Sequence, residues 1–202
     1  MNNLTPSSIV LLLPLFSAFV ILLFHKQLKG AAALISIGSS AICALISTFI
    51  ILGAHDTVHR ILPFIHINDN ISFDINALID GQSRGMLFIV TFVGFLVHLY
   101  SHGYMKDDDA RPRYFGSLSM FMFSMTGIVL ADNLVMMFIF WELVGLSSYL
   151  LIGHWFQKPS ACEAAKKAFL TNRIGDFGFM IGILLLFGLN HGNVEFADLA
   201  DS

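Results

Sequence analysis

Long apolar runs separated by short polar connectors dominate this sequence. Six runs approach the roughly 20 residues that a helix needs to cross the hydrocarbon core of a bilayer. They lie at residues 7–24, 31–53, 79–100, 113–131, 133–153 and 165–188. Stretches such as "ISIGSSAICALISTFIILG" contain no charged residue, so they lack the polar face of a helix in a soluble bundle. The pattern predicts an all-α polytopic membrane protein with about six transmembrane helices.

The connector between the second and third runs has a different period. Its stretch "PFIHINDNISFDI", residues 63–75, alternates apolar and polar positions around an Asp-Asn pair. Alternation is typical of a half-buried strand, and Asp-Asn suits a tight turn. We expect a small β-hairpin on the membrane surface, with an irregular loop as the alternative.

Composition agrees with a membrane location. Of the 202 residues, 56% are hydrophobic and 12% are charged, whereas a soluble domain has about 25% charged residues. The net charge of −3 gives no sign of a nucleic-acid partner. The two cysteines, Cys43 and Cys162, form no CxxC or Cys/His cluster, so no metal site or disulfide is predicted. The N-terminus lacks the basic region of a signal peptide, so its apolar run is interpreted as a transmembrane helix.

Basic residues are distributed unevenly between the connectors. Nine of the eleven Lys and Arg residues fall in or beside connectors one, three and five, against two elsewhere, Arg60 and Arg84. The nine are Lys26, Lys29, Lys106, Arg111, Arg113, Lys158, Lys166, Lys167 and Arg173. The positive-inside rule therefore predicts that these connectors are cytoplasmic or on the equivalent positive side, with both termini opposite. A bacterial inner membrane is the expected location.

Two carboxylates are predicted near the centre of the membrane. Glu142 lies about nine residues into run 133–153, and Asp176 lies about eleven residues into run 165–188. A charge at this depth costs roughly 2.5–3.5 kcal/mol on insertion scales. Residues placed there at such a cost mark a proton or ion pathway, or a buried ion pair.

The last run carries a polar stripe. At 100° per residue, Lys166 and Arg173 differ by about 20°, and Asp176 lies about 60° further round. The stripe extends from a basic connector to the membrane centre, as an access path for a proton or cation would. The alternative is an Arg173–Asp176 pair that neutralises itself against a neighbouring helix.

Glu142 has no basic residue within one helical turn. It must either carry a proton or find a cation on another helix. Near the positive side, His98 and Lys167 are candidate relay residues, although an interfacial histidine is more often packed or solvated.

Three stretches carry a family resemblance. "VTFVGFLVHLYSHGYM", "ADNLVMMFIFWELVGLSSYLLIGHWFQKPSA" and "KKAFLTNRIGDFGF" resemble subunit L of proton-pumping NADH–quinone oxidoreductase, respiratory complex I. The same protein is called chain 5 in mitochondria and has a counterpart in the chloroplast complex, and the wider family includes a component of multisubunit sodium/proton antiporters. The resemblance implies an antiporter-like subunit in which Glu142 is a protonatable residue and Arg173 and Asp176 belong to the "NRIGD" motif.

The family chain is much longer than this one, so the resemblance implies an N-terminal portion. Residues 1–112 would hold transmembrane helices 1–3 and the hairpin, and residues 113–202 would begin the first antiporter-like repeat. The lysine that pairs with the family glutamate would lie on a seventh helix beyond this sequence.

The resemblance also implies a function. The chain would be a proton-translocating subunit of NADH:quinone oxidoreductase, without redox chemistry of its own. NADH, FMN, iron–sulfur clusters and quinone would be bound by the rest of the complex, and the partners would be the other membrane subunits and the lipid bilayer. The alternatives are a component of a multisubunit sodium/proton antiporter, or a non-pumping assembly fragment whose deep charges only fix helix pairing.

Overall fold

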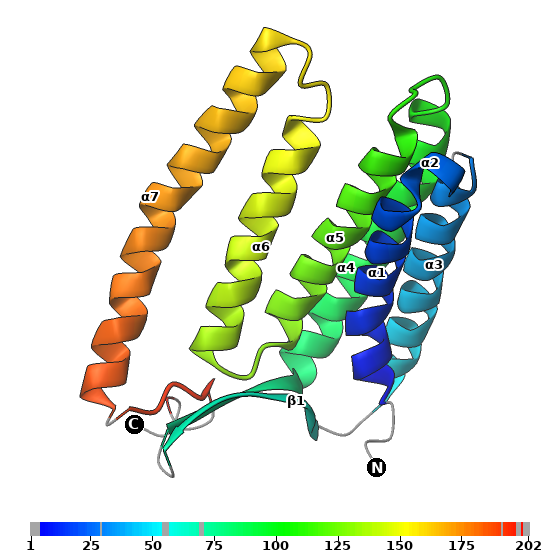
Figure 1. Cartoon of the computed structure of the whole chain (residues 1–202). Coiled ribbons are helices and arrows are strands. Elements are labelled where there is room, and N and C mark those ends of the chain that lie inside the picture. Colours follow the sequence, from blue (N-terminus) through cyan, green and yellow to red (C-terminus); the bar gives the residue numbers. More distant parts are fainter. Residues whose placement is uncertain are drawn as a thin grey trace.

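The computed structural model describes residues 5–28, 30–53, 57–68, 71–190, 192–196 and 199. Within these ranges it has six long helices, one short helix and a two-stranded hairpin (Figure 1). The long helices are α1 (Pro6–Leu23), α3 (Ala31–Leu52), α4 (Gly81–Tyr104), α5 (Arg111–Leu130), α6 (Leu134–Ile152) and α7 (Pro159–Leu189). The short helix α2 (His25–Leu28) lies in the first connector. The six predicted helices are therefore confirmed.

Five of the long helices are apolar and long enough to cross a membrane, and the helix outside this group is α5. α5 packs against α1, α3, α4 and α6, and it is the most centrally placed helix of the bundle. Because neighbouring helices surround it, α5 can carry many Ser, Gly and Thr residues where a lipid-facing helix needs large apolar ones.

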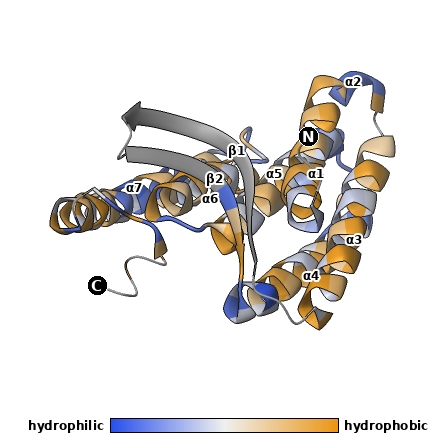
Figure 2. Ribbon diagram, turned by 90° about the horizontal axis from the view of Figure 1, so that it is seen from below, coloured by the Kyte–Doolittle hydropathy of each residue, from blue (hydrophilic) through white to orange (hydrophobic). Residues whose placement is uncertain are grey.

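Small residues form the helix contacts, and large apolar residues face outward. On the exposed side of α3 lie Leu34, Leu45, Phe49 and Leu52. Its buried side consists of Ala32, Ala33, Ser36, Ser39, Ser40, Cys43, Ala44 and Ser47. Lipid tails are as apolar as leucine, so close backbone approach and interhelical hydrogen bonds drive association. One such bond joins the hydroxyls of Ser36 and Ser119 at 2.7 Å. Figure 2 shows the result, with apolar residues around the helices and polar ones mainly at α2 and in connecting segments.

The hairpin is present and is longer than predicted. Strand β1 (Thr57–Asn68) pairs antiparallel with β2 (Ile71–Ile79), while the predicted turn residues 69–70 lie outside the described part of the chain. β2 packs against α4, α5 and α6. Asn76 donates a hydrogen bond to Asp132 at 2.7 Å, which fastens the hairpin to the connector between α5 and α6. The hairpin, the start of α1 and the end of α7 lie at the same end of the bundle (Figure 1).

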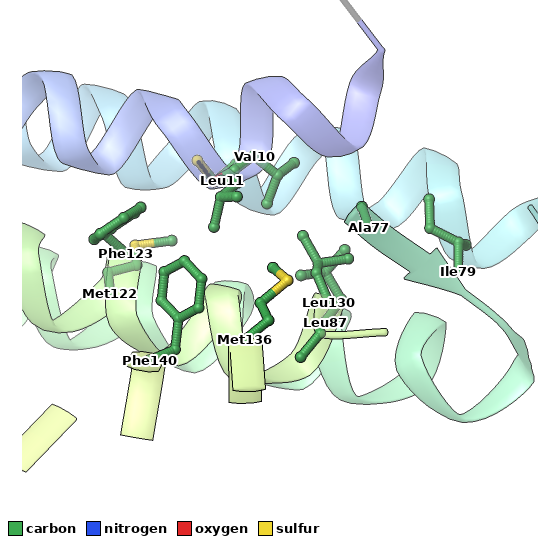
Figure 3. Close-up of a cluster of buried hydrophobic side chains, with 12 residues drawn as sticks. Val10, Leu11, Ala77, Ile79, Leu87, Met122, Phe123, Leu130, Met136 and Phe140 are labelled. Atoms are coloured by element: carbon green, nitrogen blue, oxygen red, sulfur yellow. Dashed lines mark hydrogen bonds between the residues drawn. The ribbon is translucent and has the colours of Figure 1, made fainter. Parts of the chain in front are cut away.

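An apolar cluster between α1, α5 and α6 holds the bundle together near the hairpin. Figure 3 shows its side chains pointing toward one another, among them Leu11, Met122 and Phe140. Gly127 permits this packing, because a Cβ atom at that position would overlap the ring of Phe140. The close α5–α6 contact fixes the orientation of α6, on which Glu142 lies.

α7 stands at the edge of the bundle and packs against α6 (Figure 1). It begins at Pro159, earlier than the predicted residue 165, and its 31 residues span about 46 Å. The hydrocarbon core is about 30 Å thick, so the polar first turns extend beyond it. After α7 the chain turns back: the amide of Phe196 donates to the carbonyl of Asp132, and the amide of Leu134 donates to Val194.

Candidate proton-translocation site

Glu142 has a cation partner within the described chain. α6 directs it toward α7, where its carboxylate forms an ion pair with the guanidinium of Arg173. The two side chains are 26% and 34% exposed. The sequence left two alternatives for Glu142, a bound proton or a cation on another helix. The structure shows the second.

Asp176 completes a three-charge cluster. Its Oδ2 lies 3.5 Å from Nη1 of Arg173, and its Oδ1 accepts a hydrogen bond from Nε1 of Trp141 at 3.0 Å. Asp176 is 6% exposed and so is the most buried of the three charged groups. The predicted Arg173–Asp176 contact is thus present, but Arg173 divides its interaction between two carboxylates.

Helix geometry explains why these four residues meet. Trp141 and Glu142 are adjacent on α6, so their side chains point about 100° apart. Arg173 and Asp176 are three residues apart on α7, which places them on one face and about one turn apart. The two neighbours on α6 therefore contact two successive turns of α7. The carboxylate of Glu142 meets Arg173, and the indole of Trp141 meets Asp176.

Aromatic rings cover the cluster above and below along α7. Phe169, one turn before Arg173, has its ring centroid 4.5 Å from the guanidinium carbon. Phe179, about one turn after Asp176, makes an edge contact with Trp141 at 5.8 Å between centroids. An aromatic face attracts a cation, so Phe169 helps to hold Arg173 where it meets Glu142.

The charges of the cluster do not balance. Two carboxylates face one guanidinium, so full ionisation leaves one negative charge in excess. Burying an uncompensated charge is costly, and one added proton removes the excess. One bound proton therefore balances the charges of the cluster while Arg173 still faces an ionised carboxylate.

The other predicted site residues lie apart from this cluster. Lys166 and Lys167 are exposed on early turns of α7, and Lys166 is about 10 Å from Arg173 along the helix. His98 lies on α4 and is 1% exposed, with Nδ1 2.7 Å from the carbonyl of Gly94. No contact among the described residues joins these three to Glu142, so the access-path role of Lys166 and the relay roles of His98 and Lys167 stay predictions.

Trp141 was not among the predicted site residues, although the sequence contains a signal for it. It neighbours Glu142 at membrane depth, where an indole N–H requires an acceptor because no water is available. A carboxylate predicted at the same depth on the next helix, Asp176, is the natural acceptor.

A second polar cluster joins the third and fifth connectors. Oδ2 of Asp108 accepts a hydrogen bond from Nε1 of Trp155 at 2.8 Å and lies 3.2 Å from Nε2 of His154. Arg113 donates to the backbone carbonyl of His154 at 2.7 Å. Burial lowers the pKa of His154, and this outweighs the opposite effect of Asp108. Burial alone would raise the pKa of Asp108, but hydrogen bonds from Ala110, Trp155 and His154 hold it below its ordinary value.

This second cluster predicts that acid loosens the two connectors. A histidine whose pKa is lower in the folded state stabilises that state above its ordinary pKa of about 6.5 and loses this contribution as the pH falls. Amide exchange in residues 105–110 and 153–158, corrected for its intrinsic pH dependence, should accelerate by up to about tenfold between pH 7.5 and 5.5. The contribution of Asp108 falls outside this window, because a carboxylate with a lowered pKa titrates at more acidic pH.

The matched control is His154→Gln, whose side chain can still donate to Asp108 but does not titrate. It should show little acceleration over the same pH range. An identical pH response in both proteins would contradict the role of His154.

Known families match most of the chain. Residues 64–115 match the family described as "NADH-Ubiquinone oxidoreductase (complex I), chain 5 N-terminus". Residues 131–202 match "NADH:quinone oxidoreductase/Mrp antiporter, TM". The "NAD(P)H-quinone oxidoreductase subunit 5, chloroplastic" of Zygnema circumcarinatum is 43% identical over 198 residues, which cover 93% of this chain and 28% of that protein. The protein of the same name from Chara vulgaris is 44% identical over 191 residues, which cover 90% of this chain and 29% of that protein.

Solved structures share the fold. A chain of the membrane-bound sulfane sulfur reductase, an archaeal respiratory membrane complex, superposes with a TM-score of 0.78 and 21% identity over 96% of this chain and 39% of its own. A chain of the Mrp complex from a Dietzia species superposes with a TM-score of 0.79 and 21% identity. The superposition covers 96% of this chain and 20% of that one. The solved structures show the fold alone. This chain spans less than a third of the length of the two curated relatives. The two family matches and these relatives show that the chain belongs to the chain 5 family of antiporter-like complex I membrane subunits.

Proposed function

We propose that this chain is part of a proton-translocating membrane subunit of an NADH:quinone oxidoreductase. The observation that carries the proposal is the Glu142–Arg173–Asp176 cluster, which lies near the middle of two membrane-spanning helices and has one negative charge in excess. Glu142 takes up and releases the proton. Arg173 remains within reach of both carboxylates and compensates whichever of them is ionised.

The path to this site runs along α7. Lys166 and Lys167 lie on its exposed early turns, on the side of the basic connectors, where they form the entrance for protons. Arg173 marks the depth at which the path reaches Glu142. His98 is kept as a candidate relay residue on α4. Its Nε2 has no hydrogen-bond partner within the described part of the chain, so a relay through His98 requires a further group that exchanges a proton with it.

The orientation follows from the distribution of charge. Connectors one, three and five lie at the end of the bundle away from the hairpin (Figure 1). They carry most of the basic residues, and we assign them to the cytoplasmic or equivalent positive side. The hairpin and both termini face the opposite side. The predicted bacterial inner membrane remains a proposal, since the curated relatives named above are chloroplastic.

Redox chemistry is assigned to other subunits. NADH, FMN, iron–sulfur clusters and quinone would be bound elsewhere in the complex, and other membrane subunits would pack against this one. Electron transfer elsewhere would then be coupled to proton uptake and release at Glu142 through movement of the helices.

Purification of the tagged protein from its own membrane tests this function. The chain should co-purify with NADH dehydrogenase subunits, and vesicles containing the assembly should acidify or alkalinise when NADH and quinone are added. Absence of NADH dehydrogenase subunits in the purified assembly would contradict the proposal.

A second function is a component of a multisubunit sodium/proton antiporter. The family description for residues 131–202 covers both classes. Sodium-dependent proton exchange in vesicles without any NADH oxidation would favour this alternative. The same vesicles therefore distinguish the two functions.

A further inference from the structure

Trp141 makes the two carboxylates of the cluster unequal. Its Nε1 donates to Oδ1 of Asp176 at 3.0 Å, and Oδ2 of Asp176 lies 3.5 Å from Nη1 of Arg173. Glu142 contacts Arg173 through Oε2, and it has no second hydrogen-bond donor within the described part of the chain. Asp176 therefore faces two donors, and Glu142 faces one.

An added proton meets these two carboxylates differently. An indole N–H and a guanidinium can only donate, so each oxygen of Asp176 faces a group that cannot accept a hydrogen bond from a protonated carboxyl. A proton on Asp176 would place a donor against a donor. At Glu142 the guanidinium engages Oε2, so Oε1 can carry the proton without loss of a contact. Donors also favour the ionised form of the carboxylate that they contact.

Burial acts in the opposite direction. Asp176 is the more buried of the two carboxylates, and burial disfavours the charged form. α6 is the main neighbour of α7, and Glu142 is its only charged residue, so α6 brings no other charge to this choice. Without the indole donor, each carboxylate would face Arg173 alone and the more buried one would take the proton. The hydrogen bond from Trp141 is thus the contact that decides between them.

We propose that Trp141 is a positioning residue that keeps Asp176 ionised, so that the exchangeable proton of the cluster resides on Glu142. Asp176 is then the fixed partner that Arg173 retains when Glu142 is protonated. Uptake forms one O–H bond at Glu142, release breaks it, and no other bond changes. This inference rests on the proposed function and assigns the proton within its site.

Infrared difference spectroscopy of the purified native assembly reads where the proton is. A protonated carboxyl has a carbonyl stretch separate from that of a carboxylate, and the band of this cluster is the one that disappears in Glu142→Gln. A heavy carbon isotope in the side-chain carboxyl of every glutamate should shift this band. The same label in every aspartate should leave it in place.

Trp141→Phe keeps an aromatic ring but removes the donor. The ratio of proton occupancy at Glu142 to that at Asp176 should fall by about tenfold or more, as expected for loss of one hydrogen bond to a charged group. A component of the band that shifts with labelled aspartate should therefore appear. Proton translocation per NADH oxidised should fall with the share of the proton that has moved. A merely structural role of Trp141 would change the amount of assembly without this isotope signature.

Two further variants separate the hydrogen bond from the ring. Trp155→Phe removes the same kind of bond, from an indole to Asp108, but outside the cluster, and it should leave the band unchanged. Benzothienylalanine in place of Trp141 keeps the bicyclic shape that contacts Phe179 and has sulfur where the indole has N–H. It should reproduce the isotope pattern of Trp141→Phe even if that variant assembles poorly.

The outcomes distinguish this inference from the proposed function. A band that still shifts only with labelled glutamate when the indole donor is absent would overturn the inference and leave the proposed function intact. So would a band of the unchanged protein that shifts with labelled aspartate instead. If no carboxyl band disappears in Glu142→Gln, both are overturned.

Discussion

Replacing Glu142 by Gln is expected to lower proton translocation per NADH oxidised by roughly tenfold or more, while the assembled complex persists. Glutamine has the shape of glutamate and its carbonyl still accepts from Arg173, so the contact between α6 and α7 remains. It cannot take up a proton. The cluster then contains one carboxylate and one guanidinium, and it no longer has an excess negative charge for a proton to neutralise.

The measurement is the pH change in vesicles, divided by the rate of NADH oxidation and by the amount of assembled complex. Glu163→Gln is the matched control, since it makes the same substitution on an exposed early turn of α7, outside the cluster. Pumping per complex that equals that of this control would rule out Glu142 as the proton site. A drop in complex abundance without any loss of pumping per complex would instead favour the assembly-fragment alternative.

Replacing Arg173 by Met should have the largest effect on stability. Methionine keeps an unbranched apolar stem but leaves Glu142 and Asp176 without their shared cation. Loss of one member of a buried charge pair costs about 3–5 kcal/mol. We expect about 2 kcal/mol here, because Arg173 is partly exposed and solvent reduces the penalty.

Paired substitutions test whether this loss comes from the charges. Glu142→Gln combined with Arg173→Met leaves Asp176 with its Trp141 hydrogen bond, and it should regain part of the stability lost in Arg173→Met. Arg173→Lys keeps the charge and should be intermediate. Thermal unfolding of the purified assembly measures all four proteins. Strictly additive effects of Glu142→Gln and Arg173→Met would mean that the ion pair does not couple the two helices.

The elements of this fold follow from local patterns, but the partner of Glu142 does not. Hydropathy predicts the spans, and alternation predicts the hairpin, because both depend on neighbouring residues. The contact between Glu142 and Arg173 depends on which face of α6 meets α7. That face is set by packing, such as the contact of Phe140 with Gly127, which no spacing rule encodes.

Helix ends, the access path and the relay residue show the limits of sequence patterns in another way. The start of α7 at Pro159 escaped prediction because hydropathy detects only the apolar part of a helix, whereas the first turns of α7 are polar. Lys166 and His98 lie on helices near the basic connectors, as expected. Their distance from the cluster could not be predicted from their spacing in the sequence. The proposed division of the chain between residues 112 and 113 stays a prediction.

The turn that follows α7 gives this helix the geometry of a lever. The hydrogen bonds of Phe196 and Leu134 tie the chain beyond Leu189 to the base of α6, which makes that end the fulcrum. Arg173 lies about 24 Å from Leu189 along the helix, and Pro159 lies about 45 Å from it. A rigid tilt of α7 about that end would therefore move Pro159 nearly twice as far as Arg173, and the contacts of Trp155 and His154 with Asp108 would have to yield. The two ends of α7 therefore differ in how far a tilt would carry them, with the smaller movement on the side of the hairpin.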